Sequence, residues 1–144
     1  MLHHQSGFPF DQYIDIEEFV IKMQCHFVPS QAQKDIINFV SAIKTSEVRK
    51  SEDDGIAQKV SVENEIGRLE SVKFDPIVKL APYRYFREVE QVESVFLLRM
   101  RKCGDSLPQV ALFEADAGEW KIRAMDIVQE HLREILPEGA RIIC

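Results

Sequence analysis

Apolar residues near the start of the chain recur at helical spacing and predict two consecutive helices. Pro29 separates the two, because the residue before a proline avoids helical backbone angles. Ser30 is a suitable N-cap for the second helix, whose basic end is expected to reach Lys50. The apolar stripe of the first helix holds Ile16, Phe19, Val20, Met23 and Phe27, and that of the second holds Ile36, Ile37, Phe39, Val40 and Ile43.

The middle of the chain gives a mixed signal. Val60 and Val62 alternate with polar residues as in a short strand, whereas Val62, Ile66 and Leu69 also fit a helix. Between these alternatives, a short helix over 62–69 is the preferred prediction. Residues 77–80 lie between Pro76 and Pro82, so they are expected to form a short edge strand or an extended connection.

The second half changes to the period of two that is typical of strands. Residues 83–91 and 92–101 are expected to be extended, and residues 109–115 and 119–125 to form a hairpin around Asp116-Ala-Gly118. In that hairpin Phe113 faces Ile122, Ala115 faces Trp120, and Glu114 pairs with Lys121 across the strands. A final helix is predicted over 126–136.

These elements predict one α+β domain over residues 1–144. Its N-terminal helices pack on a curved antiparallel sheet formed mainly by the C-terminal half, and a further helix follows. Residues 1–10 lack periodicity and are expected to be a loose N-terminal arm, pinned by Phe8 and Phe10.

Composition narrows the function classes. Lys and Arg total 18 against 24 Asp and Glu, a net charge of −6 without a basic tail, which disfavours a general nucleic-acid binder. Apolar runs are too short to cross a bilayer, and the start lacks a signal-peptide pattern, so a cytoplasmic location is expected. The three cysteines, Cys25, Cys103 and Cys144, are too widely spaced for a zinc site or a disulfide framework. Cys25 is expected in the core, and neither a metal nor a cofactor is predicted.

Residues 94–125 resemble part of a known family. A long strand, a second strand, a glycine turn and the segment Trp120-Lys-Ile are similar to the closing meander of the ketosteroid-isomerase-like (nuclear-transport-factor type, cystatin-like) α+β cone. The resemblance implies a conical cavity between helices and sheet. Members of this family are enzymes, ligand binders or protein-binding dimers, so the fold alone does not fix the function.

Candidate sites follow from the predicted faces of the sheet. Phe96, Met100, Phe113 and Trp120 are expected to line a pocket for a small apolar ligand. Val95, Leu97, Leu112 and Met125 are expected on the opposite face beside arginines, a mixture that is typical of an interface and favours a homodimer.

Other chemistry has weaker signals. His26 and Asp126 are candidate bases for an enzyme, although a helix-end histidine and an N-cap explain them as well. The run Tyr83-Arg-Tyr-Phe-Arg87 interleaves aromatic and basic residues and could contact single-stranded nucleic acid, but acidic neighbours offset its charge. The leading hypothesis is a non-catalytic ligand-binding or protein-interaction module. An isomerase or hydrolase acting on a small apolar molecule is the alternative, and a single-strand nucleic-acid contact is the third reading.

Overall fold

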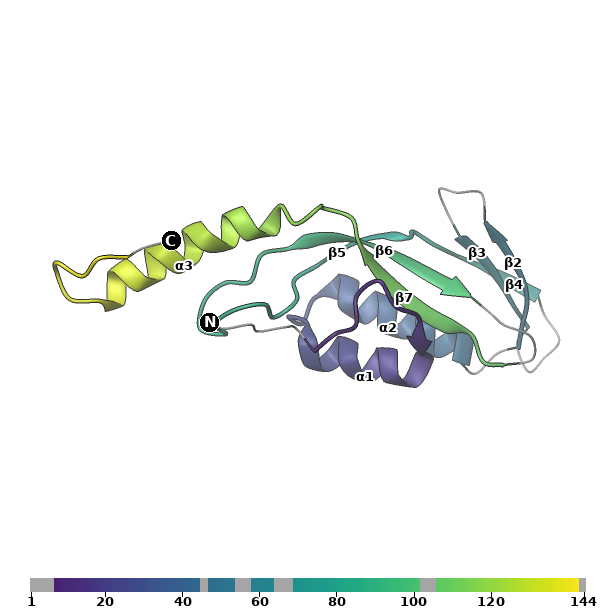
Figure 1. The fold of residues 1–144 in the computed structure, drawn as a ribbon. Helices are drawn as coiled ribbons and strands as arrows, with labels where there is room; N and C mark the ends of the chain where they lie inside the picture. Colours follow the sequence, from purple (N-terminus) through teal and green to yellow (C-terminus); the bar gives the residue numbers. More distant parts are fainter. Residues whose placement is uncertain (1–6, 45–46, 54–57, 64–68, 102–105, 143–144) are drawn as a thin grey trace.

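The computed structural model describes residues 7–44, 47–53, 58–63, 69–101 and 106–142. Its main sheet is antiparallel and has the strand order β1-β7-β6-β5 (Figure 1). The four strands are β1 (Ile14–Asp15), β5 (Ile77–Leu80), β6 (Ser94–Arg101) and β7 (Gln109–Glu114). The edge strand predicted between the two prolines is confirmed as β5. Just before it, the Asp75 carboxylate accepts the N–H of Ile77 at 3.0 Å.

Helices α1 (Ile16–His26) and α2 (Gln31–Lys44) cover one face of this sheet (Figure 1). Their predicted apolar stripes supply the core, and Ser30 caps α2 by accepting the N–H of Gln33 at 3.1 Å. The strands meet the helices with alternate residues, as a pleated sheet requires. The buried core comprises Phe8, Ile16, Phe19, Met23, Phe27, Ile36, Val40, Ile43, Val78, Leu80, Phe96, Leu98, Val110 and Leu112.

The N-terminal segment is held where the structure describes it. Phe8 is buried in the core, and the Phe10 ring stacks on Phe96 with centroids 5.2 Å apart. Phe8 and Phe10 therefore hold residues 7–10 against the core, as predicted for these two side chains, whereas residues 1–6 of the predicted loose arm lie outside the described residues. The expected core position of Cys25 is wrong, because its side chain is exposed on the outer side of α1.

A second antiparallel sheet replaces the helix predicted in the middle of the chain. Strands β2 (Glu47–Asp53), β3 (Gln58–Glu63) and β4 (Leu69–Phe74) pair in that order. Val62 lies in β3 and Leu69 begins β4, so the preferred helix over 62–69 is wrong and the strand alternative holds for Val60 and Val62. The second helix also ends earlier than predicted, since Lys50 pairs within β2.

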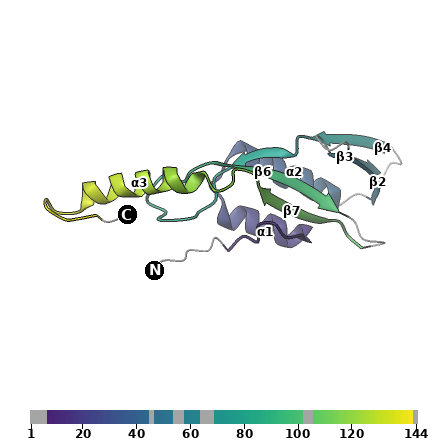
Figure 2. The same cartoon turned by 45° about the horizontal axis from the view of Figure 1, so that its top comes forward.

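The predicted hairpin over 109–125 is wrong in its second half. β7 pairs with β6, and a turn then leads into helix α3 (Trp120–Ile135), six residues earlier than the predicted helix. Ala117 and Gly118 both have positive φ, 52° and 82°, and Asp116 accepts the N–H of Gly118 at 3.1 Å. Figure 2 shows that α3 then runs away from the sheet, on the side opposite β2–β4.

The architecture is therefore α+β, with N-terminal helices on an antiparallel sheet and a C-terminal helix, as the sequence predicts. Beyond Ile135 the chain turns back beside α3 (Figure 1). Because α3 projects from the packed part of the molecule, its apolar side chains lie outside the main core.

Candidate functional site

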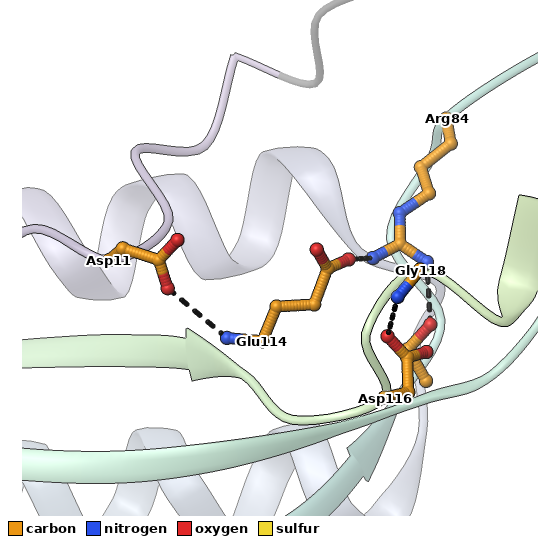
Figure 3. A network of polar contacts seen from close by, with 6 residues as sticks. Asp11, Arg84, Glu114, Asp116 and Gly118 are labelled. Atoms are coloured by element: carbon orange, nitrogen blue, oxygen red, sulfur yellow. Dashed lines mark hydrogen bonds and ion pairs between the residues drawn. The ribbon is translucent and has the colours of Figure 1, made fainter.

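The C-terminal helix is attached to the domain through a buried arginine. Arg84, in the connection between β5 and β6, donates to Ser94 Oγ at 2.6 Å. It also pairs with the carboxylate of Glu114 (Figure 3). Its side chain is 5% exposed and that of Glu114 is 32% exposed. Burial lowers the pKa of Arg84, and the charges of Glu114 and Asp116 oppose that shift.

Trp120, the first residue of α3, covers this arginine. The guanidinium carbon of Arg84 lies 4.0 Å from the indole centroid, a cation–π contact in a nearly dry environment. The indole N–H of Trp120 is buried without a hydrogen-bond partner among the described residues. The start of α3 is thus positioned by a stacked cation rather than by a side-chain cap, which the helix lacks.

The segment that carries Arg84 is itself held in shape by side chains. Gln91 accepts the N–H of Arg84 at 3.0 Å and donates to the carbonyl of Phe86 at 2.8 Å. The Tyr85 hydroxyl accepts the N–H of Val92 at 3.1 Å and donates to the Glu90 carbonyl at 2.5 Å. Burial raises the pKa of Tyr85. These hydrogen bonds hold the backbone around Arg84 in place, so that its side chain is positioned to contact Glu114.

An apolar groove lies where this segment meets the helix. It has a volume of about 360 Å³ and is lined by Arg84, Tyr85, Trp120, Lys121, Ala124, Met125 and Val128. The helix continues the apolar surface away from the groove, since Ile122, Met125, Ile135 and Leu136 are 64%, 53%, 62% and 40% exposed. The groove and these residues together are called the α3 surface below.

A more polar cleft lies on another side of Trp120. Its volume is about 210 Å³, and its walls include Ser94, Asp116, Glu119 and Arg123. Charges of both signs line it, so it offers no uniform field for a charged ligand. The apolar groove is therefore the more distinctive feature near the helix base.

The structure does not bring the four predicted pocket residues together. Phe96 is fully buried in the core, and Met100 packs at its edge beside a space of about 10 Å³. Phe113 lies opposite Leu97 and therefore on the other face of the sheet, where it contacts Tyr13. Trp120 belongs to α3 rather than to a strand, so the pairing that placed it beside Phe113 is absent.

The predicted interface residues are also divided. Val95 and Leu97 lie half-buried on the face away from α1 and α2, as expected. Leu112 is wrong for this face, because it pairs with Leu98 and is fully buried in the core. Met125 is exposed, but on α3 and not on the sheet.

The remaining candidates occupy separate places. His26 ends α1 beside Gly7, and burial, Lys22 and Arg87 lower its pKa. Asp126 is an exposed residue within α3, so its predicted role as an N-cap is wrong. In the Tyr83–Arg87 run, Arg84 points inward and Arg87 stacks over Tyr83 at 4.8 Å. Cys103 and Cys144 lie outside the described residues.

Sequence reasoning missed Arg84 as the organising residue of this site. The aromatic and basic run around it was a usable signal, because an arginine among aromatic residues is often a buried stacking partner. Within the described ranges, no group of three or more His, Cys, Asp or Glu side chains could hold a metal ion. No described helix combines the length and apolar character needed to cross a membrane.

Comparisons of the chain with models of protein families, with curated proteins and with solved structures find no match. The resemblance to the ketosteroid-isomerase-like cone therefore stays a prediction.

Proposed function

We propose that this chain is a non-catalytic protein-interaction module that forms a homodimer and uses the α3 surface as its contact. The observation that carries the proposal is the exposure of large apolar residues along a helix that projects from the domain. A contiguous exposed apolar patch is often an interaction site. The cytoplasmic location expected from the sequence stays a prediction.

The distribution of polarity around α3 supports a protein partner over a small ligand. Asp126, Glu130 and Arg133 share one side of the helix, while Met125, Leu132 and Ile135 share the other. An apolar stripe along several turns fits an extended partner better than it fits one small molecule. A helix that lays its apolar side into a groove is a common mode of protein recognition.

The anchor supports the same proposal. Arg84 is occupied by Ser94, Glu114 and Trp120, so its role is to fix the direction of the helix. A helix fixed at its base presents its apolar stripe with little loss of freedom on binding, which favours affinity. The catalytic alternatives have less support, since His26 and Asp126 lie on different helices and Asp126 is exposed on α3.

The test is the molar mass of the purified full chain, measured by light scattering or sedimentation over a dilution series. We expect a dimer at about 100 µM that dissociates toward about 1 µM, the range of a modest interface. Met125→Glu should give a monomer with an unchanged circular-dichroism spectrum. Glu130→Gln, on the charged side of the same helix, should leave the dimer intact. A wild-type chain that is monomeric at every concentration contradicts the homodimer.

A further inference from the structure

The exposed apolar residues of α3 form two groups at opposite ends of the helix. Ile122 and Met125 lie near its start, and Ile135 and Leu136 near its end. Met125 and Ile135 are about 15 Å apart along the axis, given the usual rise per residue. The half-buried Val128 and Leu132 lie between them, so the four positions from 125 to 135 recur at spacings of three, four and three.

This spacing is that of the seam of two helices packed side by side. We infer that α3 pairs with α3 of a second copy in antiparallel orientation, an inference that rests on the proposed homodimer. The two copies are aligned so that Met125 of one contacts Ile135 of the other. The same alignment places Val128 against Leu132 and Ile122 beside Leu136, so each exposed apolar residue meets an apolar partner.

The groove at the base of the helix fits this orientation. Tyr85, Trp120 and Ala124 widen the apolar surface beside Met125. In the antiparallel pair, Ile135 and Leu136 of the second copy reach this groove. In the middle of the seam, the two helices contact only each other. In a parallel pair these two residues meet their own equivalents, far from either groove.

The charges of the helix favour the same orientation. Its first turn holds no acid and carries Lys121, whereas its last turn carries Glu134, with Arg133 as the only base there. Lys121 and Glu134 each have the sign that the dipole of their own helix disfavours. An antiparallel neighbour places the negative end of one helix beside the positive start of the other.

The available area suits a modest dimer. The four most exposed apolar residues offer roughly 100 Å² each, so a pair buries about 800 Å² from them and more than about 1,000 Å² with Val128 and Leu132. A value near the lower bound of specific interfaces agrees with dissociation in the micromolar range. The apolar surface along α3 is therefore enough for a second copy without a further partner.

Disulfide trapping tests the orientation. In a chain whose Cys25, Cys103 and Cys144 are replaced by serine, Met125→Cys and Ile135→Cys are prepared separately, and each is mixed with the other before oxidation. We expect the mixture to give a disulfide-linked dimer joining positions 125 and 135. Each variant alone should give at least about tenfold less, because equivalent positions are about 15 Å apart, beyond the reach of a disulfide. Glu130→Cys, on the charged side, is the matched control and should remain unlinked.

The outcomes separate this inference from the homodimer itself. The molar mass and circular dichroism of each variant before oxidation show whether it still folds and dimerises. Self-linking of Met125→Cys at a level above that of the mixture indicates a parallel pair, and it overturns the orientation while the homodimer stands. A dimer in which none of these positions links uses another surface and also overturns it. A monomeric parent chain contradicts the homodimer.

Discussion

The pairing of Arg84 with Glu114 predicts a measurable cost when the carboxylate loses its charge. Glu114→Gln retains an oxygen that can accept the guanidinium N–H but leaves the charge of Arg84 without its main counterion. Arg84 keeps the bond to Ser94 at 2.6 Å and the stacking on Trp120 at 4.0 Å. The variant therefore isolates the charge of the pair from its geometry.

The magnitude follows from how far each side chain is buried. Removing one partner of a fully buried ion pair costs about 3–5 kcal/mol, because the other charge is left in a dry site. Here Arg84 is 5% exposed but Glu114 is 32% exposed, so water already screens part of the attraction. We expect Glu114→Gln to lower the free energy of unfolding by about 2 kcal/mol.

Urea unfolding followed by tryptophan fluorescence is the direct assay. Trp120 is the only tryptophan and stacks on Arg84, so its emission reports on this site. With a slope near 2 kcal/mol per molar urea, the midpoint should fall by about 1 M. Glu88→Gln, an exposed carboxylate in the same connection, should change the stability by less than about 0.5 kcal/mol.

A second variant decides whether the effect belongs to the pair. Arg84→Met removes the buried charge, so adding Glu114→Gln to it should cost at least about 1 kcal/mol less than the same change costs in the wild type. Two additive effects would refute the argument that Glu114 serves to compensate Arg84. A cost of less than about 0.5 kcal/mol for Glu114→Gln alone would refute the assigned magnitude.

Two further predictions concern the ends of helices. The pKa of His26 is lowered in the folded chain, so the unfolded chain binds a proton at this residue more strongly than the folded chain does. The folded state therefore keeps its full stability above the unfolded pKa of 6.5 and loses stability as the pH falls below it. The urea midpoint should therefore drop less between pH 7 and pH 5 in His26→Gln than in the wild type, and an equal drop would contradict the role of His26. Gly118→Ala places a side chain at a φ of 82° and should cost about 1 kcal/mol, measured by thermal unfolding. Gly139→Ala is the control for backbone strain alone, because Gly139 also has positive φ but lies beyond α3 in open space. A similar cost for both variants would show that the cost of Gly118→Ala comes from backbone strain and not from contacts in the turn before α3.

The helices and the central strands were predictable because their apolar patterns are unambiguous. α1 and α2 each carry an apolar stripe of helical period, and the signals at Pro29 and Ser30 coincide with the observed break between the end of α1 at His26 and the start of α2 at Gln31. The helix after Asp116 was not predictable in the same way. Trp120, Ile122 and Ala124 alternate as in a strand, and they also fit the start of an amphipathic helix. The left-handed turn at residues 117 and 118 suits both a hairpin and a helix start.

The faces of β7 illustrate a different limit. A shift of one residue in register moves each side chain to the other face of a sheet. Leu112 and Phe113 exchange faces relative to the prediction, because the observed register pairs Leu112 with the buried Leu98 and Phe113 with Leu97 on the other face. The partner of Glu114 was also predicted wrongly. The predicted partner, Lys121, is close in sequence, whereas the observed partner, Arg84, is 30 residues away. Long-range pairings of this kind leave no local pattern.

The anchor and the apolar stripe of α3 have complementary physical roles. An isolated helix of about 15 residues is only marginally stable in water, and most helices in proteins depend on packing of an apolar side. Arg84 and Trp120 supply such packing at the start of α3, where Ala124 is also buried. Beyond the first turns the helix runs away from the domain, and Ile135 stays 62% exposed. In the antiparallel pair that we propose, the anchored start of the second copy would supply the missing contact at that end, so that the most stable part of each helix would support the least stable part of the other.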